Sequence, residues 1–230
     1  VPMLSDEFSD VANEWAAAAL EMLSSERVEN QLALARAGAI LPLTLLLGSD
    51  DEHAQRHASG ALLNIATPSR DHGGLQHHAA GRDNLSAVVV PLVDLLIVRN
   101  PTALKKAAEL LSILASRSVA GRAAIADSGG IPPIVRMLGD GMSPSQLQVH
   151  AAACLYDLVR TPNGKSEVAK AGGVEPLIRM LSCTNLDAQT CAAGTLWLLT
   201  TTGITVQHQV AEAGAVGPLV TLLSSSSLVA

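Results

Sequence analysis

Two histidines in the sequence have the spacing of metal ligands on a helix. His53 and His57 are four residues apart, so one helical face would present both rings. Three more, His72, His77 and His78, follow in the next segment. A zinc site on a helix needs a glutamate in an HExxH pattern or cysteines that complete the ligand set, and neither accompanies these histidines. We therefore expect solvated helix and loop histidines, with no metal and no other cofactor.

The residues that could act as nucleophiles lack the patterns that activate them. Serine, histidine and aspartate all occur, but the sequence has no nucleophile elbow and no catalytic-cysteine signature. The glycine-containing stretches at 128–130 and 139–143 lack the lysine and the strand–loop–helix context of a phosphate-binding loop. We interpret them as turns, and we expect the chain to be non-enzymatic.

The cysteines indicate the redox environment. Cys154, Cys183 and Cys191 lie inside apolar helical patterns, form no CxxC pair and are odd in number. Such residues are typical of reduced, buried cysteines that pack as small hydrophobic side chains. We expect a reducing compartment, in the first place the cytoplasm, and the nucleus and the cilium stay open.

Charge and hydropathy argue against two classes of partner. The formal net charge is -6, and no long run of like charges forms a basic tail, so a nucleic-acid-binding face is not expected. The longest apolar stretch, residues 85–98, contains Pro91 and Asp94 and is too short to cross a bilayer. We expect neither nucleic-acid binding nor a membrane span.

A proline-containing apolar segment recurs at a nearly constant spacing. Its prolines are 49, 42, 43 and 42 residues apart, at Pro42, Pro91, Pro133, Pro176 and Pro218. A period near forty is typical of solenoids, in which each unit is too thin to bury its own apolar face and stacks on its neighbours. Because 48 % of the residues are hydrophobic but only 2 % are aromatic, we expect closely packed helices of Ala, Leu, Val and Ile. The sequence therefore predicts an all-α solenoid.

Each repeat is predicted to contain three helices. A short helix ends at a glycine corner, a second helix contains the proline, and a polar turn leads into a long third helix. Glycine at the corner can adopt a positive φ, which lets two helices meet at a steep angle. The predicted units of a single array over 1–230 are 1–25, 27–67, 68–116, 117–160, 161–201 and 202–230. The first and last are truncated, so we expect a longer chain or a larger complex, with capping elements outside this sequence.

One repeat departs from the pattern. The spacing of 49 between Pro42 and Pro91 exceeds the others by about seven residues, and the extra length falls in 67–84, where proline, glycines and histidines disfavour a helix. The short first helix of this repeat has Ala87 and Val88 in place of its glycine corner. We expect an extended loop over 67–84.

Spacing also separates two faces of the long helix in the 117–160 repeat. The positions that follow the i, i+3, i+4, i+7 pattern of a buried stripe are Ala151, Cys154, Leu155 and Leu158. The positions with the same spacing on another face are Ala153, Tyr156, Asp157 and Arg160. This second face is the candidate binding surface.

These segments resemble the armadillo-repeat family. The second helix follows the family's AGxIPPLVxLL pattern, and the third helix follows AxGALxNLA, with ASGALLNIA at 58–66 and AAGTLWLLT at 192–200 as the closest copies. The resemblance extends over nearly all of the chain. It implies a right-handed superhelix of three-helix repeats of about 42 residues, whose third helices line a concave groove that binds extended peptides or partner proteins.

The resemblance also indicates which positions face the groove. In the family, an asparagine of the third helix often holds the peptide backbone, and a tryptophan one turn earlier forms pockets for basic side chains. Here only Asn64 keeps the asparagine, and no tryptophan occupies the other position, which argues against recognition of basic import signals. The cations Arg56, Lys105, Lys106 and Arg160 are scattered among acids, which argues against a strongly basic groove.

Two aromatic residues stand at the position just before the asparagine. Tyr156 and Trp197 are 41 residues apart, one repeat, and are therefore expected on adjacent third helices. One interpretation makes them anchors of an interface, as exposed aromatic residues on a rigid face often are. The other places both in the seam between repeats, where they only pack. The sequence leaves the two open.

We expect a non-enzymatic module that binds a protein or extended peptide, as scaffold, adaptor or structural part of an assembly. The predicted contact residues are Asn64, Glu109, Tyr156, Asp157, Arg160 and Trp197. One alternative is the substrate-recruiting region of a multidomain enzyme, such as a ubiquitin ligase that combines a U-box with armadillo repeats. Another is obligate packing inside a filament or ciliary assembly.

Overall fold

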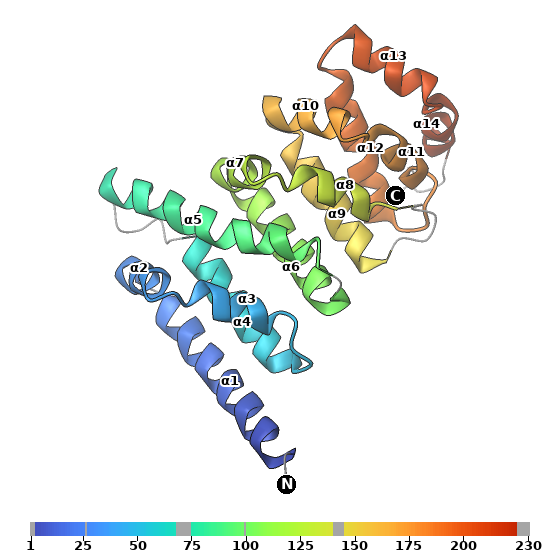
Figure 1. Ribbon diagram of the computed structural model, residues 1–230. Coiled ribbons are helices and arrows are strands. Elements are labelled where there is room, and N and C mark those ends of the chain that lie inside the picture. Colours follow the sequence, from blue (N-terminus) through green and yellow to red (C-terminus); the bar gives the residue numbers. More distant parts are fainter. Residues whose placement is uncertain (1–2, 26, 68–74, 99, 140–144, 225–230) are drawn as a thin grey trace. The chain divides into compact units, whose positions relative to one another are not determined.

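The computed structural model describes residues 3–25, 27–67, 75–98, 100–139 and 145–224 (Figure 1). Over these ranges it contains fourteen helices and no strand, which confirms the predicted all-α class. The chain divides into two compact units, Val1–Leu114 and Ala115–Ala230, and each is described by itself.

The first unit contains two short helices, α2 (Val28–Arg36) and α3 (Ile40–Leu46), between longer ones. The longer ones are α1 (Met3–Ser24), α4 (Glu52–Ala66), α5 (Leu75–Leu95) and α6 (Pro101–Arg117). The long helix α1 packs against α4, and α4 also packs against α2 and α3 of its own repeat. The predicted order of two short helices and one long helix is therefore present in α2, α3 and α4.

The second unit contains the same order twice. Its helices are α7 (Val119–Asp127), α8 (Ile131–Met137), α9 (Gln146–Leu158), α10 (Pro162–Lys170), α11 (Val174–Met180), α12 (Leu186–Thr200), α13 (Ile204–Glu212) and α14 (Val216–Leu223). The long helices α9 and α12 pack against each other, and each also packs against the short second helix of its own repeat.

Glycine corners join the first and second helices of four repeats. The φ angles there are +79° at Gly38, +70° at Gly129, +74° at Gly172 and +86° at Gly214. An L-residue with a side chain disfavours this left-handed conformation, whereas glycine adopts it at little cost. The predicted corners are confirmed.

Helix α5 departs from the prediction of an extended loop over 67–84. Residues 75–84 belong to this helix, so the prediction is wrong there, while residues 68–74 lie outside the described residues. With Ala87 and Val88 at the corner position, no glycine reverses the chain. The segments expected to form two short helices therefore form one, with Pro91 inside it.

The core consists of small and aliphatic side chains at equivalent positions of the long helices. The predicted stripe of α9 is confirmed, because Ala151, Cys154, Leu155 and Leu158 are each at most 1 % exposed. The equivalent buried residues of α4 are Ala58, Ala61, Leu62 and Ile65, and those of α12 are Ala192, Thr195, Leu196 and Leu199. Alanine at the first of these positions lets the short helices approach closely, and burial of the larger members supplies the hydrophobic stabilisation.

Three long helices have a glutamine at the same repeat position, and its side chain forms a hydrogen bond to the segment that precedes the helix. The glutamine amide donates to a backbone carbonyl: Gln148 Nε2 to Leu138 O at 2.9 Å and Gln189 Nε2 to Leu181 O at 2.7 Å, both at the end of the second helix, and Gln55 Nε2 to Ser49 O at 2.5 Å, in the turn after it. Carbonyls at a helix C-terminus have no partner within the helix. The glutamine thus satisfies an acceptor that would otherwise be left unpaired.

We expect Gln189→Ala to lower the free energy of unfolding by about 1 kcal/mol, because the Leu181 carbonyl loses its donor in a partly buried position. Urea denaturation of the variant measures this loss. The control is Gln209→Ala, which truncates an exposed glutamine of α13. Equal stability of the two variants would contradict a structural role for the repeated glutamine.

Candidate protein-binding surface

The exposed face of α9 and α12 contains both aromatic residues of the candidate site. Trp197 on α12 is 64 % exposed, whereas Tyr156 on α9 is half-buried. A Cβ atom added to Gly194 would lie only 2.7 Å from Cε2 of Tyr156, so the tyrosine ring rests on the backbone of α12 at that glycine. Tyr156 therefore packs in the seam between adjacent third helices, and Trp197 presents its side chain to solvent.

The first unit repeats this packing with a different side chain. Glu21 of α1 has the repeat position of Tyr156, and its carboxylate lies against Gly60 of α4, where an added Cβ would collide with it. The same carboxylate contacts Nδ1 of His57 at 2.7 Å. In both units a glycine of one third helix thus receives a side chain from the preceding third helix.

We expect Gly194→Ala to lower the free energy of unfolding by about 1–2 kcal/mol, because the rigid ring of Tyr156 must move away from the new methyl group. Gly60→Ala is the matched control. There the colliding atom is the end of a flexible glutamate, which can turn away while alanine improves helix propensity. We expect a change of at most about 0.5 kcal/mol.

Thermal or urea unfolding of the two variants checks this difference. A double-mutant cycle of Gly194→Ala with Tyr156→Ala isolates the clash, since removing the ring should remove the penalty. Additive effects of the two substitutions would show that the ring does not press on Gly194.

Asp157 lies beneath this surface. It is 9 % exposed, and its Oδ1 accepts from Nη1 of Arg160 at 3.3 Å, while the arginine side chain is exposed. Burial, and secondarily the Asp157 charge, raises the pKa of the Cys154 thiol. Burial also raises the pKa of Cys191, with smaller effects of Asp187 and Asp157. Both thiols are therefore neutral at physiological pH. Of Asp157 and Arg160, the exposed arginine is the residue that a partner would contact.

The two predicted contact residues of the first unit already have intramolecular partners. Asn64 Nδ2 donates to the carbonyl of Glu21 at 3.4 Å and to the Ser24 hydroxyl at 3.2 Å, so its amide faces α1. Glu109 Oε2 pairs with Lys106 Nζ at 3.3 Å. Both side chains are half-buried.

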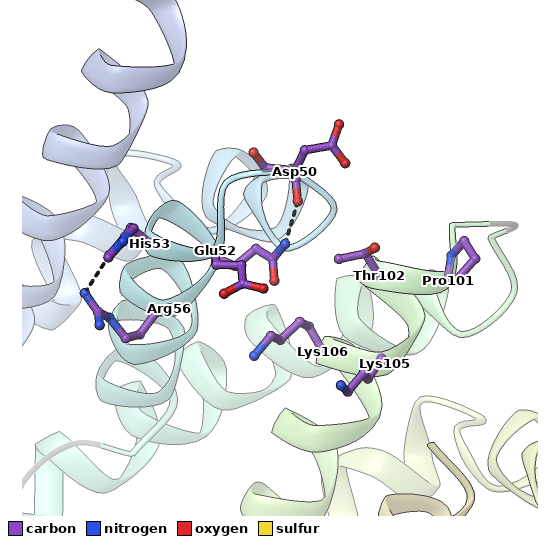
Figure 2. A pocket seen from close by; sticks show the side chains of 10 residues that line it. Asp50, Glu52, His53, Arg56, Pro101, Thr102, Lys105 and Lys106 are labelled. Carbon is purple, nitrogen blue, oxygen red and sulfur yellow. Dashed lines mark hydrogen bonds between the residues drawn. The ribbon is translucent and has the colours of Figure 1, made fainter. Parts of the chain in front are cut away.

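A cavity of about 680 Å³ lies between the N-terminal halves of α4 and α6 (Figure 2). Its lining includes Glu52, His53, Arg56, Thr102, Lys105 and Lys106. The sequence predicts scattered cations, but in the structure Arg56, Lys105 and Lys106 all line one cavity. The sequence contains a sign of this grouping. Arg56 and Lys105 are 49 residues apart, the same spacing as the repeat prolines Pro42 and Pro91, so they occupy equivalent positions of two repeats.

Comparison with known proteins decides the family. The family model for the armadillo/beta-catenin-like repeat matches residues 27–67 and 161–201. A crystal structure of an engineered protein is 30 % identical, covers 93 % of this chain and 83 % of its own, and has a TM-score of 0.69. The chain belongs to the armadillo-repeat family.

Designed armadillo repeat proteins share the fold of this armadillo chain. One is 23 % identical, with 93 % of this chain and 86 % of that chain covered and a TM-score of 0.67. Another, solved in complex with the peptide (KR)4, is 22 % identical, with 92 % and 85 % covered and a TM-score of 0.68. At this identity the likeness shows the fold alone. No curated protein is significantly similar in sequence.

The helical histidines of the armadillo chain have separate partners. His53 Nδ1 contacts Arg56 Nη2 at 3.1 Å, whereas His57 contacts Glu21. No group of three or more His, Cys, Asp or Glu residues with metal-binding geometry occurs among the described residues. His72 and the side chains of His77 and His78 lie outside the description.

Within the described ranges, no helix combines the length and apolar character needed to cross a membrane.

Proposed function

We propose that this armadillo chain is a non-enzymatic binding module that holds a protein or an extended peptide on the exposed face of its third helices. The third helices of this face are α4 and α6 in the first unit and α9 and α12 in the second, and α1 is the third helix of the truncated repeat 1–25. The proposed repeats are those delimited in the sequence, with 27–67, 117–160 and 161–201 each contributing one complete set of three helices.

The observation that carries the proposal is the exposure of Trp197. A tryptophan that is 64 % exposed on a well-packed helix leaves a large apolar surface in water, and such residues dominate binding energy when a partner covers them. Tyr156 and Arg160 lie on the neighbouring helix α9 and would offer the same partner an aromatic ring and a cation. Because the helices are held by their core, little conformational entropy is lost when a partner binds.

Two further findings support the proposal. A designed armadillo protein of the same fold was solved with a bound peptide, and peptide binding on this fold is therefore physically feasible. The thiols of Cys154, Cys183 and Cys191 are unpaired, which supports a reducing compartment such as the cytoplasm.

The four lysines of the sequence allow a direct test. Lys105 and Lys106 lie on the third helix α6, whereas Lys165 and Lys170 lie on the first helix α10. The full-length protein would be treated in its native extract with a lysine-directed crosslinker, and the linked peptides identified by mass spectrometry. We expect partner peptides joined to Lys105 and Lys106. Partner crosslinks confined to Lys165 and Lys170 would place the interface on the first helix of a repeat and would contradict the proposal.

A further inference from the structure

The cavity between α4 and α6 has a chemical character that the proposed function does not yet use. Arg56 and Lys105 occupy the same repeat position on two third helices, and both line the cavity. Figure 2 shows Lys105 and Lys106 extending from α6, whereas Arg56 extends from α4 toward His53, on the side away from the two lysines.

Two of the three cations have no acidic partner among the described residues. The guanidinium of Arg56 contacts only a ring nitrogen of His53, at 3.1 Å, and Lys105 forms no ion pair there. Lys106 differs, because it shares its charge with Glu109. Arg56 and Lys105 are both exposed and are therefore free to contact an incoming anion.

Two acids also line the cavity and set the limit of its positive charge. The Asp50 carboxylate points away from Lys105 and Lys106 in Figure 2, and it lies on the opposite rim. Glu52 extends toward the interior of the cavity, but it lies outside ion-pair distance of the cations in the described structure. The lining residues are three cations and two acids, and the charge of Lys106 is offset by Glu109, which is not a lining residue, so the positive character rests on Arg56 and Lys105.

The backbone adds to this charge. The cavity lies at the beginning of two helices, of 15 and 17 residues, and the amino end of a helix carries a partial positive charge. Their capping residues, Asp51 and Asn100, already accept from the first amides. The side-chain cations are therefore the groups that would contact a ligand directly.

We propose that this cavity receives the carboxylates of an acidic segment in the bound partner, with Arg56 and Lys105 as the contacting residues. The inference rests on the proposed function, because it specifies the partner of the third-helix face. We take a peptide as the source of the anion, because the two cations without an acidic partner complement acidic side chains spaced along an extended chain. The basic peptide (KR)4, which is bound in the complex of the designed armadillo protein, should be repelled here.

The test uses the full chain and three fluorescein-labelled octapeptides, (EG)4, (SG)4 and (KR)4, with binding followed by fluorescence anisotropy at low salt. We expect the protein to bind (EG)4 in preference to both others. Binding should be lost at high ionic strength, because exposed charges are screened. Failure of (EG)4 to bind more tightly than (SG)4 would overturn the inference.

A pair of double variants tests the location of binding. Arg56→Ala with Lys105→Ala removes the two free cations, and we expect about tenfold weaker binding of (EG)4. Arg27→Ala with Arg36→Ala removes two exposed cations elsewhere in the same unit and lowers the net charge equally. This control should keep the affinity of the unmodified chain. Equal losses in the two variants would show that net charge alone attracts the peptide, and would overturn the cavity assignment.

The same variants separate this inference from the proposed function. If a crosslinked partner still binds Arg56→Ala/Lys105→Ala with full affinity but loses affinity for Trp197→Ala, the cavity inference is wrong and third-helix binding stands. If (EG)4 distinguishes the two double variants but the partner ignores Trp197→Ala, the cavity stands and the proposed anchor is wrong. Circular dichroism of each variant confirms that the helices are intact.

Discussion

Replacing Gly164 with alanine is expected to lower the free energy of unfolding by about 3 kcal/mol. A Cβ atom at this position would collide with the carbonyl oxygen of Leu158 and lie 2.7 Å from its carbonyl carbon. Both are backbone atoms at the corner between α9 and α10. That corner is already held, since the Thr161 hydroxyl donates to the Leu158 carbonyl at 2.9 Å and accepts from the Gly164 amide at 3.1 Å. The methyl group therefore cannot be accommodated without breaking the corner.

Gly217→Ala is the matched control for this prediction. Gly217 lies in the short helix α14, and nothing would lie within 4 Å of an added Cβ. Alanine should be neutral there or stabilise the helix by up to about 1 kcal/mol. Urea denaturation of both variants gives the comparison. If Gly164→Ala unfolds at the same urea concentration as Gly217→Ala, the close approach of α9 and α10 is not a determinant of stability.

Trp197→Ala is expected to weaken partner binding by about thirtyfold or more, which corresponds to about 2 kcal/mol for an aromatic anchor. The stability of the chain should barely change, because the side chain is 64 % exposed and contributes little to the core. Calorimetric titration with the partner identified by crosslinking measures the affinity, and thermal unfolding measures the stability.

Trp15→Ala is the control for the tryptophan. Trp15 on α1 is 66 % exposed, almost the same as Trp197. It stands two positions before the buried Ala17, and two residues turn a helix by about 200°, so it lies on the side of α1 opposite to α4. The partner should bind this variant with unchanged affinity. A larger loss for Trp15→Ala than for Trp197→Ala would reverse the assignment of the binding face.

The sequence was sufficient to predict the features that depend on backbone geometry and period. The glycines at 38, 129, 172 and 214 recur with the prolines, and each adopts the positive φ that the corner needs. The stripe from Ala151 to Leu158 is buried as its helical spacing indicated. Such features follow from one residue type or one helical period, and both can be read without knowing the neighbours.

Features that depend on contacts between repeats could not be predicted in the same way. Tyr156 and Trp197 share a repeat position, yet one ring rests on Gly194 and the other is in solvent. Whether each ring is packed depends on the residue that faces it from the next third helix. The position of the ring within its own repeat does not reveal that residue. The continuous helix α5 was not predicted, because the proline, glycines and histidines of 67–84 suggested a loop, whereas the absent corner glycine favours one long helix.

The cationic cavity was missed for a related reason. Arg56 and Lys105 are 49 residues apart along the chain, and only their equivalent repeat positions indicate that they are neighbours. In a solenoid, residues one repeat apart become neighbours, so the comparison between repeats is the more informative one. The burial of Asp157 depends on side-chain packing in the same way and was likewise not evident from its spacing.

Hydroxyl-radical footprinting tests the binding face most directly, because it reports the solvent access of individual tryptophan and methionine side chains. The free protein should be oxidised readily at Trp197, Trp15 and Met22, which are 64 %, 66 % and 75 % exposed. With the partner bound, we expect the oxidation rate of Trp197 to fall severalfold while Trp15 and Met22 keep their rates. Protection of Trp15 and Met22 with an unchanged rate at Trp197 would contradict binding on the third-helix face of α9 and α12.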